Sequence, residues 1–418
     1  MDDNEFLNDK VRRFLEYYSG RHEQDSKIDN LVRVLDGRPD HVKPLDLVPM
    51  DELEQRLLAI EKLLPRLIPA TPGEGLFPDS NFTALQTAVL LMMPLASLQA
   101  TSRSQSRNVT ALQLRDFNKL FDRFLRPGET PFIEIGTMSP LPSKGKGPAG
   151  SGPSTPARQS TAQGGSGQGE TQRDRAERDK CYNQDHGRCV VTGLSNPHVC
   201  HIIPYTWNNT AYRHQRASWF TLALTLVSPR NPYLHVLQQG IGSSDKAWNM
   251  VSLSPLLHFW WLKGFFAFKC MGITPVDGSD NLSEITLQFR WMPRSPNPDA
   301  SRFIKQDEQP DANRDFLSKL THYYSDACGV EGCIDCPHTA AIAAHNIETD
   351  HRIVSGDLIK VRRNTDVAER FKSMIDIQWA LICAAAMSGA AQAPELLGVD
   401  DVEYYEDDGD EDQTVEGE

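Results

Sequence analysis

The sequence, 418 residues long, lacks long apolar runs and an export signal. Its longest uninterrupted apolar stretch, from Trp379 to Met387, has nine residues, whereas about 18 are needed to cross a bilayer. The N-terminus, MDDNEFLNDK, is acidic and polar, whereas a secretory signal begins with basic residues followed by apolar ones. We therefore expect an intracellular protein, nuclear or cytoplasmic, that has no membrane partner.

Apolar residues and cysteines are both scarce. The apolar fraction is 39%, against about 45–50% in ordinary globular domains, and the mean hydropathy is −0.45. Part of the chain is therefore expected to stay unfolded. The eight cysteines are too few for a disulfide framework. A close group of them therefore indicates metal binding or chance, in a reduced compartment.

Positive charge is absent from the C-terminal end. Residues 400–418 contain 11 acidic residues and no Lys or Arg, which accounts for most of the net charge of −13. Residues 181–305, in contrast, contain 11 Lys and Arg against 6 Asp and Glu, a local net charge of +5. A basic stretch within an acidic chain is compatible with a partner that carries phosphate groups.

Composition divides the chain into four parts. Residues 1–135 carry apolar side chains at helical spacing, which predicts a helical N-terminal module whose protein partners the sequence does not indicate. Residues 139–170 contain 8 Gly, 5 Pro and 6 Ser and no aromatic residue, which predicts a disordered linker over 136–175. Residues 176–395 are the second predicted domain, and residues 396–418 are a predicted disordered acidic tail.

The second domain is predicted to mix strands and helices, so we expect an α+β fold. Six of the seven Trp residues lie between positions 207 and 291, among many β-forming residues, which indicates a dense core. Ser355-Gly356 predicts the turn of a short hairpin within residues 352–363. Apolar side chains at helical spacing then predict a helix from Asp366 to Ala391.

The core motif of this domain, residues 181–270, places two histidines on neighbouring elements. His201 lies on a short β-forming segment. Asn249 opens an apolar strand, and His258 follows on a helix that begins at Ser254-Pro255. This order predicts one imidazole on a strand and another on a helix, with a cation and a phosphate between them.

These segments resemble the ββα-metal motif of the HNH endonucleases, in the variant common in uncharacterised fungal proteins. The resemblance covers about residues 176–395, and it consists of four sub-motifs in the order of that family: Cys189–Gly193, Cys200–Tyr205, Asn249–His258 and Trp261–Lys269. The first sub-motif predicts a strand followed by a turn. Asn249 lies 48 positions after His201, a separation that implies an inserted subdomain.

The resemblance implies hydrolysis of phosphodiester bonds in nucleic acid, with DNA as the first choice of partner and RNA as the second. It makes His201 the candidate general base, a role that suits an imidazole because it titrates near neutral pH. It implies that Asn249 holds the loop of the motif and that His258 is the metal ligand on the helix. One divalent cation, expected to be Mg²⁺, would bind the scissile phosphate.

Two positions depart from the family pattern. Cys200 stands where many members have Asp, Glu or His as a metal ligand, and a thiolate suits Zn²⁺ better than Mg²⁺. Leu262 stands four residues after His258, where Asp is frequent. Two interpretations stay open: an active metal-dependent nuclease, or a catalytically inert scaffold on the same fold that binds nucleic acid or protein. If Cys200 faces the ion, Cys200→Asp should raise the affinity for Mg²⁺.

A second group of candidate ligands follows at Cys328, Cys333, Cys336 and His338. Three thiols and an imidazole within eleven residues have the composition of a structural Zn²⁺ site. The tight spacing of Cys336 and His338, and the lack of a second C-x2-C pair, favour incidental cysteines in a loop. The zinc interpretation would make the chain a zinc-stapled interaction protein.

Overall fold

The computed structural model describes residues 40–67, 81–104, 107–126, 174–229, 231, 234, 239–305, 308–309, 311–325 and 342–397. Of these residues, 48% are helical and 19% lie in strands, so the predicted mixture of helix and sheet is confirmed. Residues 136–173 of the predicted linker and residues 398–418 of the predicted tail lie outside the described residues.

Within the range predicted as an N-terminal module, the described residues 40–67, 81–104 and 107–126 are mainly helical, and the rest of residues 1–135 lies outside the described residues. The helices are α3 (Leu53–Leu67), α4 (Ala84–Met92), α5 (Leu95–Arg103) and α6 (Arg107–Leu125). Thr83 caps the N-terminus of α4: its side chain accepts a hydrogen bond from the Gln86 amide, and the Gln86 side chain accepts one from the Thr83 amide. This reciprocal capping satisfies amides that the first turn of a helix leaves without intrahelical partners.

A three-stranded antiparallel sheet forms the framework of the C-terminal half. Its strand order is β4 (Phe266–Pro275), β5 (Leu282–Trp291) and β9 (Leu358–Asn364). Four rings on β4 and β5 are fully buried and pack against one another: Phe266, Phe268, Phe289 and Trp291. Cross-strand aromatic pairs of this kind stabilise a sheet in one register.

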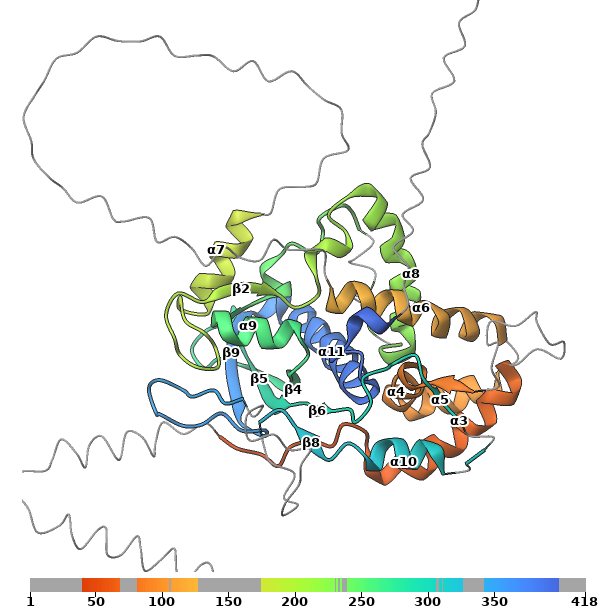
Figure 1. Cartoon of the computed structure of the whole chain (residues 1–418). Coiled ribbons are helices and arrows are strands. Elements are labelled where there is room, and N and C mark those ends of the chain that lie inside the picture. The colour runs from red at the N-terminus through yellow and green to blue at the C-terminus, as the bar shows by residue number, and fades with distance from the viewer. Residues whose placement is uncertain are drawn as a thin grey trace, which may run out of the picture.

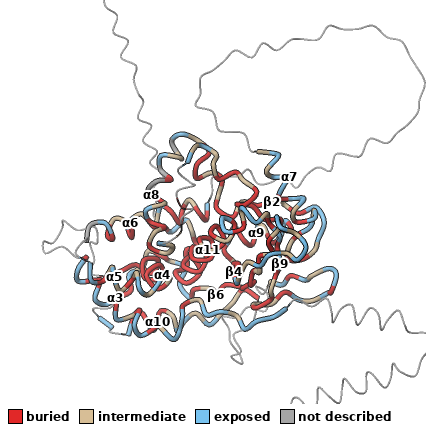
Figure 2. The backbone as a smooth tube through the Cα atoms, turned by 180° about the vertical axis from the view of Figure 1, so that it is seen from behind, coloured by how far each residue is buried: buried red, intermediate tan, exposed pale blue. Residues whose placement is uncertain are grey.

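The long helix α11 (Thr365–Ser388) follows β9 and packs against both β4 and α4. It crosses the middle of the molecule and is buried along most of its length (Figures 1 and 2). It ends at Gly389, which has a φ of +96°, a left-handed conformation that favours glycine. The helix predicted over Asp366–Ala391 is confirmed, with its end slightly earlier.

The hairpin predicted within residues 352–363 is wrong. Only β9 is a strand there, and it pairs with β5 from Leu282↔Asn364 to Gln288↔Leu358. The preceding segment turns away because the Asp357 carboxylate accepts a hydrogen bond from the Val354 amide and contacts the rings of His41 and His351. β9 therefore pairs with β5, which is distant in the sequence, and not with the segment directly before Ser355, as the turn residues predicted.

The remaining elements are short or connect these parts. They are α7 (Arg175–Gln184), β2 (His198–His201), α8 (Ala211–Val227), β3 (Met250–Leu253), α9 (Pro255–Leu262), α10 (Ala312–Ser318), and the pairs β1 (Phe82–Thr83) with β7 (Phe303–Ile304) and β6 (Pro293–Arg294) with β8 (His322–Tyr323). The 3-10 helices are η1 (Met50–Glu52), η2 (Tyr205–Trp207), η4 (Ala247–Asn249) and η5 (Pro394–Leu397).

The two halves of the described chain share one hydrophobic cluster, which extends from Val48 to Leu397. α4 packs against α11, and α6 packs against α8. α8 lies in the insertion between His201 and Asn249, so the predicted insertion contributes to this shared core.

Within the part of the chain that the structure describes, no single helix has the length and apolarity needed to cross a membrane. By length and composition alone, α4 and α5 meet the requirement together, as a pair bent by 116°.

Candidate active site

β2, β3 and α9 form a compact strand–strand–helix unit at the core motif. β2 and β3 pair antiparallel, from His198↔Leu253 to His201↔Met250. Ser254 caps α9 by accepting a hydrogen bond from the Leu257 amide. The strand with His201, the strand after Asn249 and the helix with His258 therefore follow the predicted order.

The strand predicted over Cys189–Gly193 is absent, and only a turn is present there. The Gly193 amide donates to the Cys189 carbonyl, and Gly193 has a φ of +71°. The Val190 amide donates to the Ser252 carbonyl, which attaches this turn to β3. The β-branched residues were thus a misleading signal, because the turn geometry that glycine permits prevailed.

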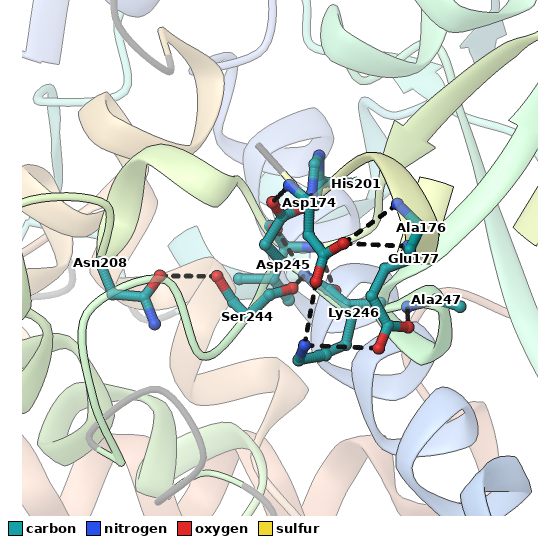
Figure 3. A network of polar contacts seen from close by, with 11 residues as sticks. Asp174, Ala176, Glu177, His201, Asn208, Ser244, Asp245, Lys246 and Ala247 are labelled. Atoms are coloured by element: carbon teal, nitrogen blue, oxygen red, sulfur yellow. Dashed lines mark hydrogen bonds and ion pairs between the residues drawn. The ribbon is translucent and has the colours of Figure 1, made fainter. Parts of the chain in front are cut away.

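His201 contacts a carboxylate that lies 44 residues later in the chain. Its Nε2 is 2.8 Å from Oδ1 of Asp245, and the two side chains are 14% and 6% exposed. The ring of Tyr205 stacks on the imidazole at a centroid distance of 5.6 Å. His201 is therefore held by the Asp245 carboxylate (Figure 3) and by the Tyr205 ring, while part of its side chain stays accessible.

Asp245 is itself held at its second oxygen. Its Oδ2 accepts a hydrogen bond of 2.6 Å from the Asp174 amide, at the N-cap of α7. A carboxylate has only acceptor atoms, so the proton in the contact with His201 belongs to Nε2. In this tautomer the lone pair that could accept a proton is on Nδ1 of His201.

α7 is attached to the segment that carries Asp245 by further contacts (Figure 3). Glu177 accepts a hydrogen bond of 2.9 Å from the Ala247 amide. Lys246 Nζ lies 3.3 Å from a Glu177 oxygen and 3.4 Å from an Asp174 oxygen. Partial burial acts against the charged amine, but the two carboxylates prevail and raise the pKa of Lys246 above its ordinary value.

Asn249 is fully buried, and its amide group joins two chain segments. Its Nδ2 donates to the carbonyls of Ile203 and Ser244, and its Oδ1 accepts from the Ile203 amide, at 2.9–3.0 Å. Ile203 lies two residues after His201, and Ser244 directly precedes Asp245. Asn249 therefore fixes the distance between the segments that carry the imidazole and the carboxylate.

His258 contacts a histidine that the sequence analysis did not select. Its Nδ1 lies 3.2 Å from Nδ1 of His198, and the two rings meet edge to face at 5.5 Å. His198 and His201 are three residues apart on β2, which places their Cα atoms about 10 Å apart. The structure thus pairs His258 with His198, and His201 with Asp245.

The placement of Cys200 does not suit the metal role that the sequence suggested. The side chain belongs to the hydrophobic core, with 2% exposure, and its thiol donates to the His198 carbonyl. Burial raises the pKa of the Cys200 thiol well above its usual range. A neutral thiol in the core is a packing group, because a cysteine binds a metal as its thiolate.

The pair formed by His198 and His258 has a spacing that fits a shared ion. Two ligands at about 2.1 Å from an ion, at octahedral to tetrahedral angles, lie about 3.0–3.4 Å apart. Imidazole donors suit Zn²⁺ and related ions better than Mg²⁺, which prefers oxygen ligands. Among the described residues, no group of three or more His, Cys, Asp or Glu could hold a metal ion. Water and phosphate would have to complete the ligand set.

The second group of candidate ligands cannot be placed in this way. Cys328, Cys333, Cys336 and His338 all lie outside the described residues, so the structural Zn²⁺ site stays a prediction.

His198 and Asp245 are the candidate site residues that the sequence analysis missed. His198 had a usable signal, since it lies within the same short strand as His201. Asp245 had none, because a lone acidic residue in a loop is not distinguished by any local pattern. The contact became visible only when the fold brought residues 201 and 245 together.

Residues 189–269 match a family model described as HNH endonuclease. The match spans a minority of the chain and contains His198, His201, Asp245, Asn249 and His258. Domains of this family typically use a divalent metal and bind nucleic acid, so the match indicates nuclease function. Comparisons with curated proteins and with solved structures gave no match.

Proposed function

We propose that the protein hydrolyses phosphodiester bonds in nucleic acid, with His201 as the general base. The observation that carries the proposal is the contact between His201 and Asp245, at the motif position where the resemblance requires a proton acceptor. A carboxylate on Nε2 leaves the Nδ1 lone pair to take a proton from water, and it stabilises the imidazolium that forms.

The site residues divide into three tasks. His201 accepts the proton, and Asn249 holds the segments around it. His258, together with His198, would hold a divalent metal. When bound, that metal would neutralise charge on the scissile phosphate and on the leaving oxygen. The resemblance implies Mg²⁺, whereas the two imidazole donors favour Ni²⁺ or Zn²⁺. DNA is the proposed substrate, and the local net charge of +5 over residues 181–305 supports a phosphate-bearing partner.

The test is a cleavage assay on supercoiled plasmid, with single-stranded RNA in parallel, in Mg²⁺, Mn²⁺, Zn²⁺ or EDTA. His201→Ala should keep metal affinity and lose about 10²–10⁴-fold in turnover. His198→Ala and His258→Ala should weaken metal binding first, and a higher metal concentration should restore part of the activity. His345→Ala, an exposed histidine outside the matched range, is the control and should cleave as the wild type does.

One observation favours a second candidate, the inert scaffold. The described residues offer a metal only two imidazoles, and Cys200 is buried in the core. If the wild type binds DNA but does not cleave it with any of these metals, the scaffold replaces the nuclease. Equal cleavage by the wild type and His201→Ala would show that the activity comes from a contaminant.

A further inference from the structure

We infer that Asp245 is the positioning residue of His201, and that the first turn of α7 holds Asp245 in place. The inference rests on the proposed function, in which His201 is the base. It adds a residue that the family resemblance does not supply. It also makes the orientation and tautomer of the His201 imidazole depend on α7, a helix that lies before the matched range 189–269.

Both carboxylate oxygens of Asp245 have a partner. Oδ1 contacts Nε2 of His201 at 2.8 Å, and Oδ2 accepts from the Asp174 amide at 2.6 Å. These two contacts fix the orientation of the carboxylate group, and the Asp245 side chain is 6% exposed. A buried carboxylate held in this way selects one tautomer of the imidazole, with the proton on Nε2 and the lone pair on Nδ1.

The segment around Asp245 is held by side chains on both sides of it. On one side, Asn249 and Asn208 bind Ser244, at its carbonyl and its hydroxyl respectively. On the other side, Glu177 accepts from the Ala247 amide and pairs with Lys246. The first group lies inside the matched range, whereas Glu177 belongs to α7. α7 therefore completes a support that the motif itself provides only in part (Figure 3).

The Asp245→Asn variant tests whether Asp245 selects the tautomer of His201, because it keeps the shape of the side chain. The Asp174 amide needs an acceptor, so the oxygen of the substituted side chain should take the position of Oδ2. The NH₂ group of that side chain then faces Nε2 of His201 and requires a lone pair there. The proton should move to Nδ1, and the base would lose its lone pair on that nitrogen.

The measurement is ¹⁵N NMR of protein labelled in its histidines, with His201→Gln to assign the His201 signals. In the wild type, Nε2 of His201 should carry the proton, and in Asp245→Asn Nδ1 should carry it. Where cleavage is measurable, kcat should fall about 10²–10⁴-fold while KM stays nearly unchanged. A wild type with the proton on Nδ1, or a tautomer that Asp245→Asn leaves unchanged, would overturn the inference.

The role of α7 is tested by comparing Glu177→Ala with the matched control Asp179→Ala. Both remove one negative charge from α7, but Asp179 is exposed, whereas Glu177 binds Ala247 and Lys246. Glu177→Ala removes the acceptor of the Ala247 amide, so it should lower kcat about tenfold and broaden the His201 signals, and Asp179→Ala should change neither. Equal effects of the two variants would overturn the role of α7.

The tautomer readout separates this inference from the proposed function, because it needs no cleavage. The expected tautomers without any cleavage would refute the nuclease but not the link between Asp245 and His201. Cleavage that depends on His201 but not on Asp245 would refute only the link.

Discussion

Cys200 and His201 are neighbours on β2 but have opposite surroundings. Side chains alternate between the two faces of a strand, so the thiol enters the hydrophobic core while the imidazole reaches Asp245. His198, two residues earlier, lies on the same face of β2 as Cys200, but it is only half-buried and contacts His258 at 3.2 Å. Depth of burial, and not the face of the strand, is therefore what separates the buried thiol from the imidazole to which we assign the proposed ligand role.

We expect Cys200→Asp to destabilise the protein rather than to raise its affinity for Mg²⁺. A carboxylate at this position would lie in the core without a cation, and such burial costs more than about 2 kcal/mol of unfolding free energy. Burial also raises the pKa of an aspartate above its unfolded value of about 3.9. The folded variant then binds its proton more tightly than the unfolded chain, so its stability falls as pH rises from about 4 to 7.

Urea denaturation at pH 4.5 and pH 7 measures the free energy of unfolding of Cys200→Asp and of Cys200→Ala. The free energy of unfolding of Cys200→Asp should lie further below that of Cys200→Ala at pH 7 than at pH 4.5. A gain in Mg²⁺ affinity without loss of stability would show that Cys200 faces the ion after all.

The sequence predicted the histidines of the site better than their partners. His201, Asn249 and His258 lie in a local pattern, so a motif could identify them. Asp245 and the pairing of His198 with His258 depend on which side chains the loops bring together. Such contacts follow from tertiary packing, which no spacing in the sequence records.

At the scale of elements, a buried ion pair joins α7 to the sheet and to the core motif. Arg363 on β9 and Asp185 directly after α7 are both almost completely buried, and their charged atoms lie 2.7 Å apart. Asp185 also accepts from the Ser252 amide of β3, and Arg363 donates to the Met250 carbonyl. The guanidinium lies 4.7 Å from the centre of the Phe371 ring on α11. One charge pair thus fixes four elements.

We expect Asp185→Asn to lower the free energy of unfolding by about 3–5 kcal/mol, because it leaves the Arg363 charge buried without its partner. The double variant Asp185→Asn/Arg363→Met removes the charge as well and should recover part of that loss. Denaturation curves of the two variants and the wild type decide this. If the double variant is less stable than Asp185→Asn alone, the pair does not act through its charge.

Elements with local signals were predicted well, and those with distant partners were not. α11 and α9 follow from apolar spacing and from a Ser-Pro start. The hairpin predicted around Ser355-Gly356 failed because the partner of β9 is β5, about 75 residues earlier in the sequence. Turn residues indicate where a chain bends, but not which strand it then meets.

At the scale of the whole molecule, the predicted division near residues 136–175 separates parts that pack together. α4 is almost entirely buried and contacts α11, and α6 contacts α8 within the insertion of the core motif. Composition indicated the segment between the two parts, but it carries no information on whether they share a core. The apolar faces of α4 and α6 need a partner, and the C-terminal half provides it.

We therefore expect that cutting the chain within residues 139–170 leaves the two pieces bound to each other. A specific protease site placed there should give two fragments that elute together on gel filtration and separate only in urea, because parting them exposes the shared hydrophobic cluster from Val48 to Leu397. Ala88→Asp puts a charge at a fully buried position of α4 and should release the fragments after cleavage. Leu58→Asp, at an exposed position of α3, is the matched control and should not. Fragments that part under native conditions, with a stable piece beginning near residue 176, would show that the core motif folds as a separate domain.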